Sequence, residues 1–255
     1  MDDSVSDPDN KTAPGFEKPK LPKRFYKEVT VADEGGESEP NLVAILLDGR
    51  PVRTPGKVKL AVPSAALAEA IADEWRGQGE EIDPSTMPLT KLANSAIDGV
   101  VGREGPVIDD VLAHAGSDLL CYRASGPEGL LARQAQSWDP VLAWAADDLG
   151  APLSLAEGVV HVAQPDTSIA ALRSAIEGVD AYALAALHVM TMLTGSALLP
   201  LAVAQGMLAP DAAWHAAHVD EDWQIDQWGE DAEAKIRRQN RKRDFDAAAK
   251  LHALS

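Results

Sequence analysis

The stretch from residue 181 to residue 210 contains no Asp, Glu, Lys or Arg. A membrane-spanning helix needs about 20 predominantly apolar residues in succession. Here the tripeptide Thr194-Gly195-Ser196 interrupts the run, and a proline and a glycine interrupt its second half. We therefore expect two short apolar helices, broken near Gly195 and buried in a helical core, and no insertion into a membrane.

Residues 23–63 have the pattern of a small antiparallel β unit. Residues 24–33 alternate and are rich in aromatic and β-branched side chains, as in a strand. Asp48-Gly49 is typical of a hairpin turn, here between strands expected at 42–47 and 51–54, and residues 57–63 form a further strand. Four short strands alone are only marginally stable, so we expect this unit to dock on the helices that follow.

After Pro63 the pattern is helical, and Ser64 is a good N-cap for the first helix. The chain is therefore expected to be an α+β protein, with a small antiparallel β-rich N-terminal domain (23–63) followed by a larger all-helical C-terminal domain (64–255). Residues 1–22 are expected to be a flexible acidic arm. Pro140 is expected to kink or split its helix, and a short strand is expected at 159–162. The expected helices are 65–77, 90–101, 106–115, 128–149, 167–177, 211–227 and 231–254.

The charge balance excludes some partners. The chain has 23 basic and 40 acidic residues, so 23 − 40 gives a net charge of −17. Such a surface repels nucleic acid and anionic membranes. The first ten residues carry four aspartates and no arginine, unlike a mitochondrial transit peptide, and they lack the apolar core of a signal peptide. We expect a monomer in a bacterial cytoplasm.

Motifs of enzymes are scarce. No phosphate-binding GxxxxGK, no GxGxxG after a strand and no GxSxG occurs. His215 and His218 have a spacing that could supply two metal ligands, but such matches are often false, and we expect neither metal nor cofactor. The one cysteine, Cys121, excludes an intrachain disulfide and has apolar neighbours typical of a buried, inert thiol. The basic run within 235–243 could touch RNA, but interleaved acids favour a solvated helix face with i, i+4 pairs.

Residues 223–231 read WQIDQWGED and are the least generic part of the chain. Glycine costs a helix about 1 kcal/mol relative to alanine, so Gly229 marks a helix end or the close approach of another chain. If the helix ran through Gly229, Glu230 would lie above Trp223. The simplest interpretation is a core helix that is interrupted at Gly229, with Glu230 as a carboxylate exposed to solvent. Steps of four, three, four and three place one set of side chains on one side of a continuous helix: Trp214, His218, Glu221, Ile225 and Trp228.

Five sequence blocks follow one another along the chain: RFYKEVTV, LLDGRPVRTPGKVKLAVPS, IADEWRGQGEEIDPSTMPLTKLANSAID, SDLLCYRA and DEDWQIDQWGED. In this order they resemble the ATP-twelve family of ATP-synthase assembly chaperones, which act on the alpha subunit. The likeness spans residues 24–231, and the order of the blocks makes it specific. Residues 232–255 depart from the mitochondrial members, which favours a bacterial one.

The resemblance implies a β-rich N-terminal domain, a helical C-terminal domain and no enzymatic activity. It also implies binding to the free alpha subunit of the catalytic head before that subunit meets beta, which prevents aggregation. Glu230 of the Trp-Gly-Glu motif is then expected to bind the partner, in the partly apolar surround of Trp223, Trp228 and Gly229. The alternatives are a scaffold protein with another partner and a metal- or cysteine-dependent enzyme.

Overall fold

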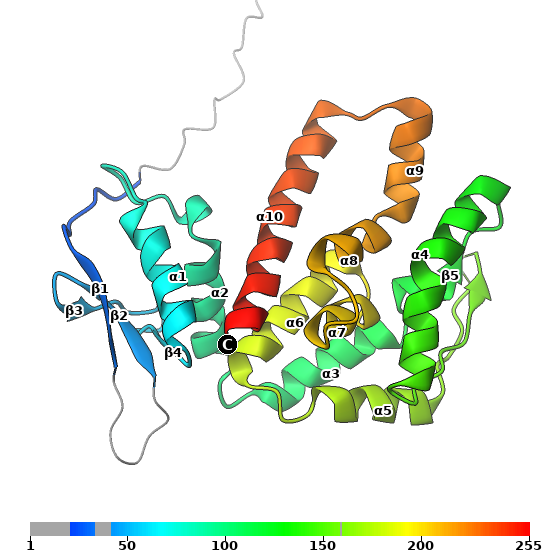
Figure 1. The fold of residues 1–255 in the computed structure, drawn as a ribbon, viewed down its shortest axis with the longest axis horizontal. Helices are drawn as coiled ribbons and strands as arrows, with labels where there is room; N and C mark the ends of the chain where they lie inside the picture. The colour runs from blue at the N-terminus through cyan, green and yellow to red at the C-terminus, as the bar shows by residue number, and fades with distance from the viewer. Residues whose placement is uncertain (1–20, 34–41, 159) are drawn as a thin grey trace, which may run out of the picture.

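The chain places a small β-sheet at one end of an otherwise helical molecule (Figure 1). The computed structural model describes residues 21–33, 42–158 and 160–255. The acidic arm expected at 1–22 lies outside these residues except for its last two. The expected α+β class, with the strands before most of the helices, is confirmed.

The main sheet has β2 (Val43–Leu47) at its centre. On one side it pairs with β1 (Val29–Asp33), and on the other with β3 (Arg50–Pro51) and β4 (Ala61–Val62), all antiparallel. Asp48 and Gly49 have φ of +48° and +76°, as a two-residue hairpin turn between β2 and β3 requires. The predicted hairpin is therefore confirmed.

Helix α1 (Ala65–Arg76) covers this sheet, so the β unit docks on a helix as expected. The helix begins where predicted, because the Ser64 side chain accepts a hydrogen bond from the Leu67 N–H at 3.0 Å. Leu67 and Ile71 lie one turn apart on its inner face and are fully buried. Burial of such a side chain contributes about 1.5–3 kcal/mol, which offsets the marginal stability of four short strands.

The rest of the chain is helical, with one small parallel sheet formed by β5 (Tyr122–Arg123) and β6 (Ala156–Glu157). The strand predicted at 159–162 is wrong for residues 160–162, because Val160 is exposed and buries nothing there; residue 159 lies outside the described part. A π-helical turn (Ala96–Val100) extends α2, and 3-10 turns occupy Pro84–Thr86 and Leu119–Cys121. The remaining helices are α2 (Pro88–Ser95), α3 (Glu104–Ala115), α4 (Glu128–Asp147), α5 (Asp166–Ile176), α6 (Ala181–Thr194), α7 (Leu198–Ala204), α8 (Pro210–Ala217), α9 (Val219–Trp228) and α10 (Ala232–Leu254).

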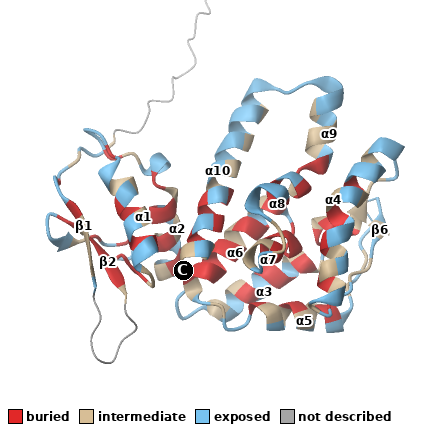
Figure 2. Ribbon diagram, in the orientation of Figure 1, coloured by how far each residue is buried: buried red, intermediate tan, exposed pale blue. Residues whose placement is uncertain are grey.

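The charge-free run forms α6 and α7, and Gly195, with φ of +68°, ends the first of them. Most of both helices is buried, as predicted (Figure 2). Across residues 21–33, 42–158 and 160–255, no helix combines the length and the apolar character needed to cross a membrane.

A buried carboxylate, Asp118, fixes the break between α6 and α7. It accepts hydrogen bonds from the Ser196 hydroxyl at 3.0 Å and from the Ala197 and Leu198 N–H groups at 2.8 and 3.1 Å. Complete burial raises the pKa of Asp118, while these hydrogen bonds act in the opposite direction. The sequence offers no local sign of this partner, which lies 78 residues before Ser196 in the chain.

Helix α10 packs along α6 and also contacts α1, α2, α7 and α8 (Figure 1). Phe245 and Leu251, from the second half of α10, are fully buried. The Ser64 hydroxyl donates a hydrogen bond to the Leu254 carbonyl, which joins the end of α10 to the start of α1. The last helix therefore lies between the sheet with α1 and α2 on one side and most of the remaining helices on the other (Figure 1).

Candidate functional site

The predicted single helix over 211–227 is wrong, because the chain breaks at His218 between α8 and α9. The imidazole is buried, stacks on Trp214 with ring centroids 3.9 Å apart, and donates from Nδ1 to the Trp214 carbonyl at 2.7 Å. Burial lowers the pKa of His218. The break separates the side chains that were expected on one side of a continuous helix, so that Trp214 is 3% exposed while Trp228 is 79% exposed.

Gly229 ends α9, with φ of +86°, and no atom lies within 4 Å of the position of a Cβ. Of the two reasons proposed for this glycine, the helix end is confirmed. Glu230 is therefore not above Trp223 on a continuous helix. Asp231 starts α10 by accepting from the Ala234 N–H at 2.8 Å.

Residues 219–243 form a helical hairpin, which we call the α9–α10 hairpin. Its turn projects beyond the other helices (Figure 1) and is exposed to solvent (Figure 2). Trp228 lies at this turn, and Ile236, also strongly exposed at 58%, lies nearby in α10. Exposed large apolar side chains at a projecting end are typical of a surface that binds another protein.

The structure brings together three of the four predicted site residues. Trp228, Gly229 and Glu230 line a hollow of about 250 Å³ between α9 and α10. Trp223 lies on another side of α9, where its ring packs against α4 and the Arg133 guanidinium lies 4.9 Å from the ring centroid. Trp223 therefore anchors the hairpin, while the other three residues are presented by it.

Glu230 already has a partner in its own chain. Its carboxylate pairs with the Lys235 ammonium at 2.9 Å, and its side chain is 29% exposed. Exposed pairs of this kind contribute only about 0–1 kcal/mol, so a charged group from another protein can replace Lys235 at little cost.

The basic run of α10 ties helices together as well as facing solvent. The expected i, i+4 pairs are present, from Arg237 to Glu233 and from Lys242 to Asp246. However, Lys242 also reaches Asp211 in α8 at 2.7 Å and holds the pKa of that carboxyl below its usual value. Arg241 donates to the Leu193 carbonyl of α6 at 2.6 Å. The prediction that these basic side chains form only a solvated face is therefore wrong, because sequence spacing does not reveal partners on other helices.

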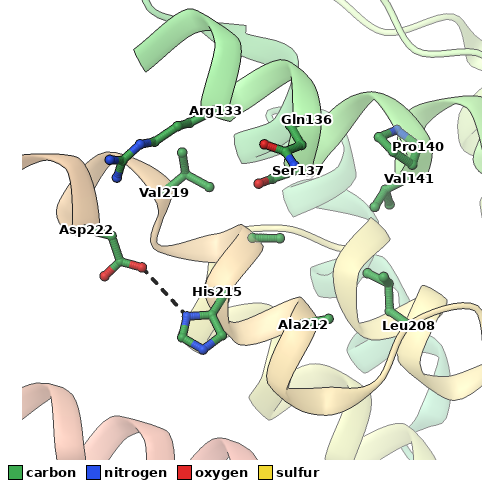
Figure 3. Close-up of a pocket in the computed structure, with 11 residues that line it drawn as sticks. Arg133, Gln136, Ser137, Pro140, Val141, Leu208, Ala212, His215, Val219 and Asp222 are labelled. Carbon is green, nitrogen blue, oxygen red and sulfur yellow. Dashed lines mark ion pairs between the residues drawn. The ribbon is translucent and has the colours of Figure 1, made fainter. Parts of the chain in front are cut away.

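A groove of about 570 Å³ lies between α4 and the α8–α9 segment (Figure 3). Its floor is apolar, with Val141 and Leu208, and its rim carries Arg133, His215 and Asp222. Pro140 lines it too. Of the kink or split predicted at this proline, the split is wrong, because α4 continues through it although proline cannot donate to the carbonyl one turn earlier.

The side chains considered for metal binding or catalysis do not form a common site. His215 is exposed and lies 3.7 Å from Asp222, whereas His218 faces the interior. In the part of the chain that the structure describes, no group of three or more His, Cys, Asp or Glu side chains could hold a metal ion. Cys121 is fully buried, as predicted, and burial raises the pKa of its thiol to about 12.

Similarity to known proteins extends along nearly the whole chain. Residues 23–146 match the family model described as ATP12 chaperone protein. The crystal structure of Atp12 from Paracoccus denitrificans is 40% identical, covers 91% of this chain and 98% of its own, and superposes with a TM-score of 0.84. The chain belongs to the ATP12 chaperone family. The family and the fold class expected from the sequence are thus confirmed.

Two further solved structures match as well. The Atu1473 protein of Agrobacterium tumefaciens is 51% identical over 92% of this chain and 86% of its own, with a TM-score of 0.86. A form of the Paracoccus denitrificans Atp12 with lysine in place of an aspartate is 39% identical over 91% and 97%, with a TM-score of 0.84. These relatives are bacterial, as expected for this chain.

Proposed function

We propose that this ATP12-family protein is a non-enzymatic chaperone for assembly of the catalytic head of F-type ATP synthase. It binds the free alpha subunit before that subunit joins beta and prevents its aggregation. The contact is the end of the α9–α10 hairpin, with Trp228, Gly229 and Glu230. The observation that carries this proposal is the 79% exposure of Trp228 beside the Glu230 carboxylate at a projecting turn.

The physical properties of this surface suit reversible binding to the apolar surface of a free subunit. A free subunit exposes apolar area meant for its neighbour, and large patches of that kind aggregate. Trp228 supplies apolar contact, and tryptophan is among the residues that contribute most to binding in protein interfaces. The net charge of −17 keeps a complex soluble by repulsion between copies. We propose that the protein acts as a monomer in the bacterial cytoplasm, without a cofactor.

The test measures light scattering of alpha subunit diluted from denaturant in the presence of this protein. Trp228→Ser and Glu230→Lys are expected to unfold at the wild-type temperature and to lose protection. Phe25→Ser is the matched control, because Phe25 is an aromatic residue that is 74% exposed next to the sheet, at the other end of the molecule. Full protection by both hairpin variants would remove this surface from the site, and a collapsed melting temperature would make these residues structural.

A pull-down from cell extract separates the proposal from its alternatives. Recovery of alpha subunit without beta is the expected result. Recovery of a different protein would identify a scaffold with another partner. Metal bound to the purified protein would favour the metal-dependent enzyme.

A further inference from the structure

We infer that Glu221, in the hollow of the α9–α10 hairpin, receives an arginine or lysine side chain from the protein partner. This inference rests on the proposed function and names the chemistry of the contact. It follows from which carboxylates of the hairpin are already used by the fold and which one is not.

Most acidic side chains of the hairpin have a partner within the chain. Asp222 pairs with Arg238 and faces His215 (Figure 3). Other polar contacts are Asp220 to Gln134 at 2.7 Å, Asp226 to Arg133 at 2.7 Å, Glu230 to Lys235 at 2.9 Å, Glu233 to Arg237 at 3.5 Å, and Asp231 to the N–H of Ala234 at 2.8 Å.

Glu221 differs from these carboxylates. The basic group that the described part of the chain places within 4 Å of it is the His218 imidazole, with Nε2 at 3.8 Å from Oε2. Burial lowers the pKa of His218, so the ring is neutral at neutral pH and supplies no charge. The Glu221 side chain is 43% exposed and therefore accessible to another molecule.

The hollow combines apolar walls with negative charge. Ile225 and Trp228 line it from α9, and three acidic residues, Glu221, Glu230 and Asp231, line it as well. The guanidinium of Arg238 also lines it but is held by Asp222. Its volume of about 250 Å³ equals that of about eight water molecules, enough for the end of one long side chain.

These features favour a positively charged side chain as the occupant of the hollow. A basic side chain in the hollow would meet the Glu221 carboxylate and lie near the Trp228 indole, whose face attracts cations. An acidic side chain would be repelled by the three acidic residues that line the hollow, and an apolar one would leave Glu221 desolvated and unpaired. The occupant is therefore an arginine or lysine of the alpha subunit flanked by apolar residues that cover Trp228.

The first experiment compares the affinity of alpha subunit for Glu221→Gln and for Glu233→Gln. Both changes remove one charge from the hairpin, but Glu233 is paired within α10 and its side chain is 85% exposed. Glu221→Gln is expected to weaken binding at least ten-fold, and Glu233→Gln less than two-fold. Equal affinities of the Glu221 variant and the wild type, or equal weakening by Glu221→Gln and Glu233→Gln, would overturn the inference while leaving the proposed function intact.

A second experiment does not depend on the identity of the partner. A leucine- and alanine-rich peptide with one central arginine is titrated into the whole protein, and so is the same peptide with uncharged citrulline. The arginine peptide is expected to bind at least ten-fold more tightly, and Glu221→Gln is expected to abolish the difference. Failure of the arginine peptide to bind, or equal binding of the two peptides, would overturn the inference. Discrimination between the peptides without any binding of alpha subunit would reject the proposed partner instead.

Discussion

The indole of Trp223 lies against Gly129 so closely that a Cβ on this glycine would fall 2.6 Å from the Cη2 atom of the ring. The contact joins α9 to the first turn of α4, and the Arg133 guanidinium lies over the same ring. Its effect is to fix the direction of the helix that ends at Trp228.

Gly129→Ala is therefore expected to displace Trp223 and destabilise the protein. Overpacking costs about 1–3 kcal/mol, while alanine in place of glycine stabilises a helix by about 1 kcal/mol, so the net loss is about 1 kcal/mol. Gly105→Ala is the matched control, because Gly105 is also the second residue of its helix and has open space around it. Urea unfolding of both variants checks this, and a stabilised Gly129→Ala protein would contradict it.

Asp118→Ala is expected to destabilise the protein by about 3 kcal/mol or more. The change leaves the Ser196 hydroxyl and the N–H groups of Ala197 and Leu198 without an acceptor in the interior. Asp118→Asn keeps one acceptor oxygen and should cost less. Chemical denaturation of the two variants provides the measurement, and a negligible loss of stability in Asp118→Ala would show that the hydrogen bonds at the start of α7 do not matter.

The stability of the protein should decrease as the pH falls through about 6.5. The pKa of His218 is lowered in the folded state, so the unfolded chain binds more protons in this range, and protonation favours unfolding. His252, whose pKa burial also lowers, acts in the same direction. His218→Gln should reduce the difference in unfolding free energy between pH 7.5 and pH 5.5. An unchanged difference in this variant would exclude His218 as a cause.

Cys121 is expected to react with a thiol reagent only after unfolding. Thiolate is the reactive form, and burial raises the pKa of this thiol to about 12. Ellman's reagent at pH 8 should modify the native protein far more slowly than the protein in urea. Cys121→Ala should still protect the alpha subunit; rapid modification of the native protein with loss of protection would indicate a functional thiol.

Local patterns predicted the parts of the fold that depend on neighbouring residues. The Asp48-Gly49 hairpin needs only two residues that tolerate positive φ, and the Ser64 cap needs only its own helix. The sequence predicted the helix break near Gly195 for the same reason. It did not predict that Asp118 accepts hydrogen bonds from the residues that follow this break. A contact between residues so far apart leaves no local pattern.

The candidate site was predicted only in part, because its geometry depends on one break. A continuous helix and the observed pair α8 and α9 satisfy the same spacing of apolar residues. The buried contact between His218 and Trp214 decides between them. Once the helix is broken, Trp223 faces α4 and Trp228 faces solvent, and the role of Glu221 becomes visible only from the ion pairs around it.

The position of α10 has a consequence for synthesis on the ribosome. This helix packs against α1, α2 and α6, yet it leaves the ribosome after all of them. While it is still inside the exit tunnel, the apolar faces that it later covers have no neighbour. Completion of the core must therefore wait until the nascent chain has emerged through Leu251, so the protein itself passes through a stage in which apolar surface is exposed.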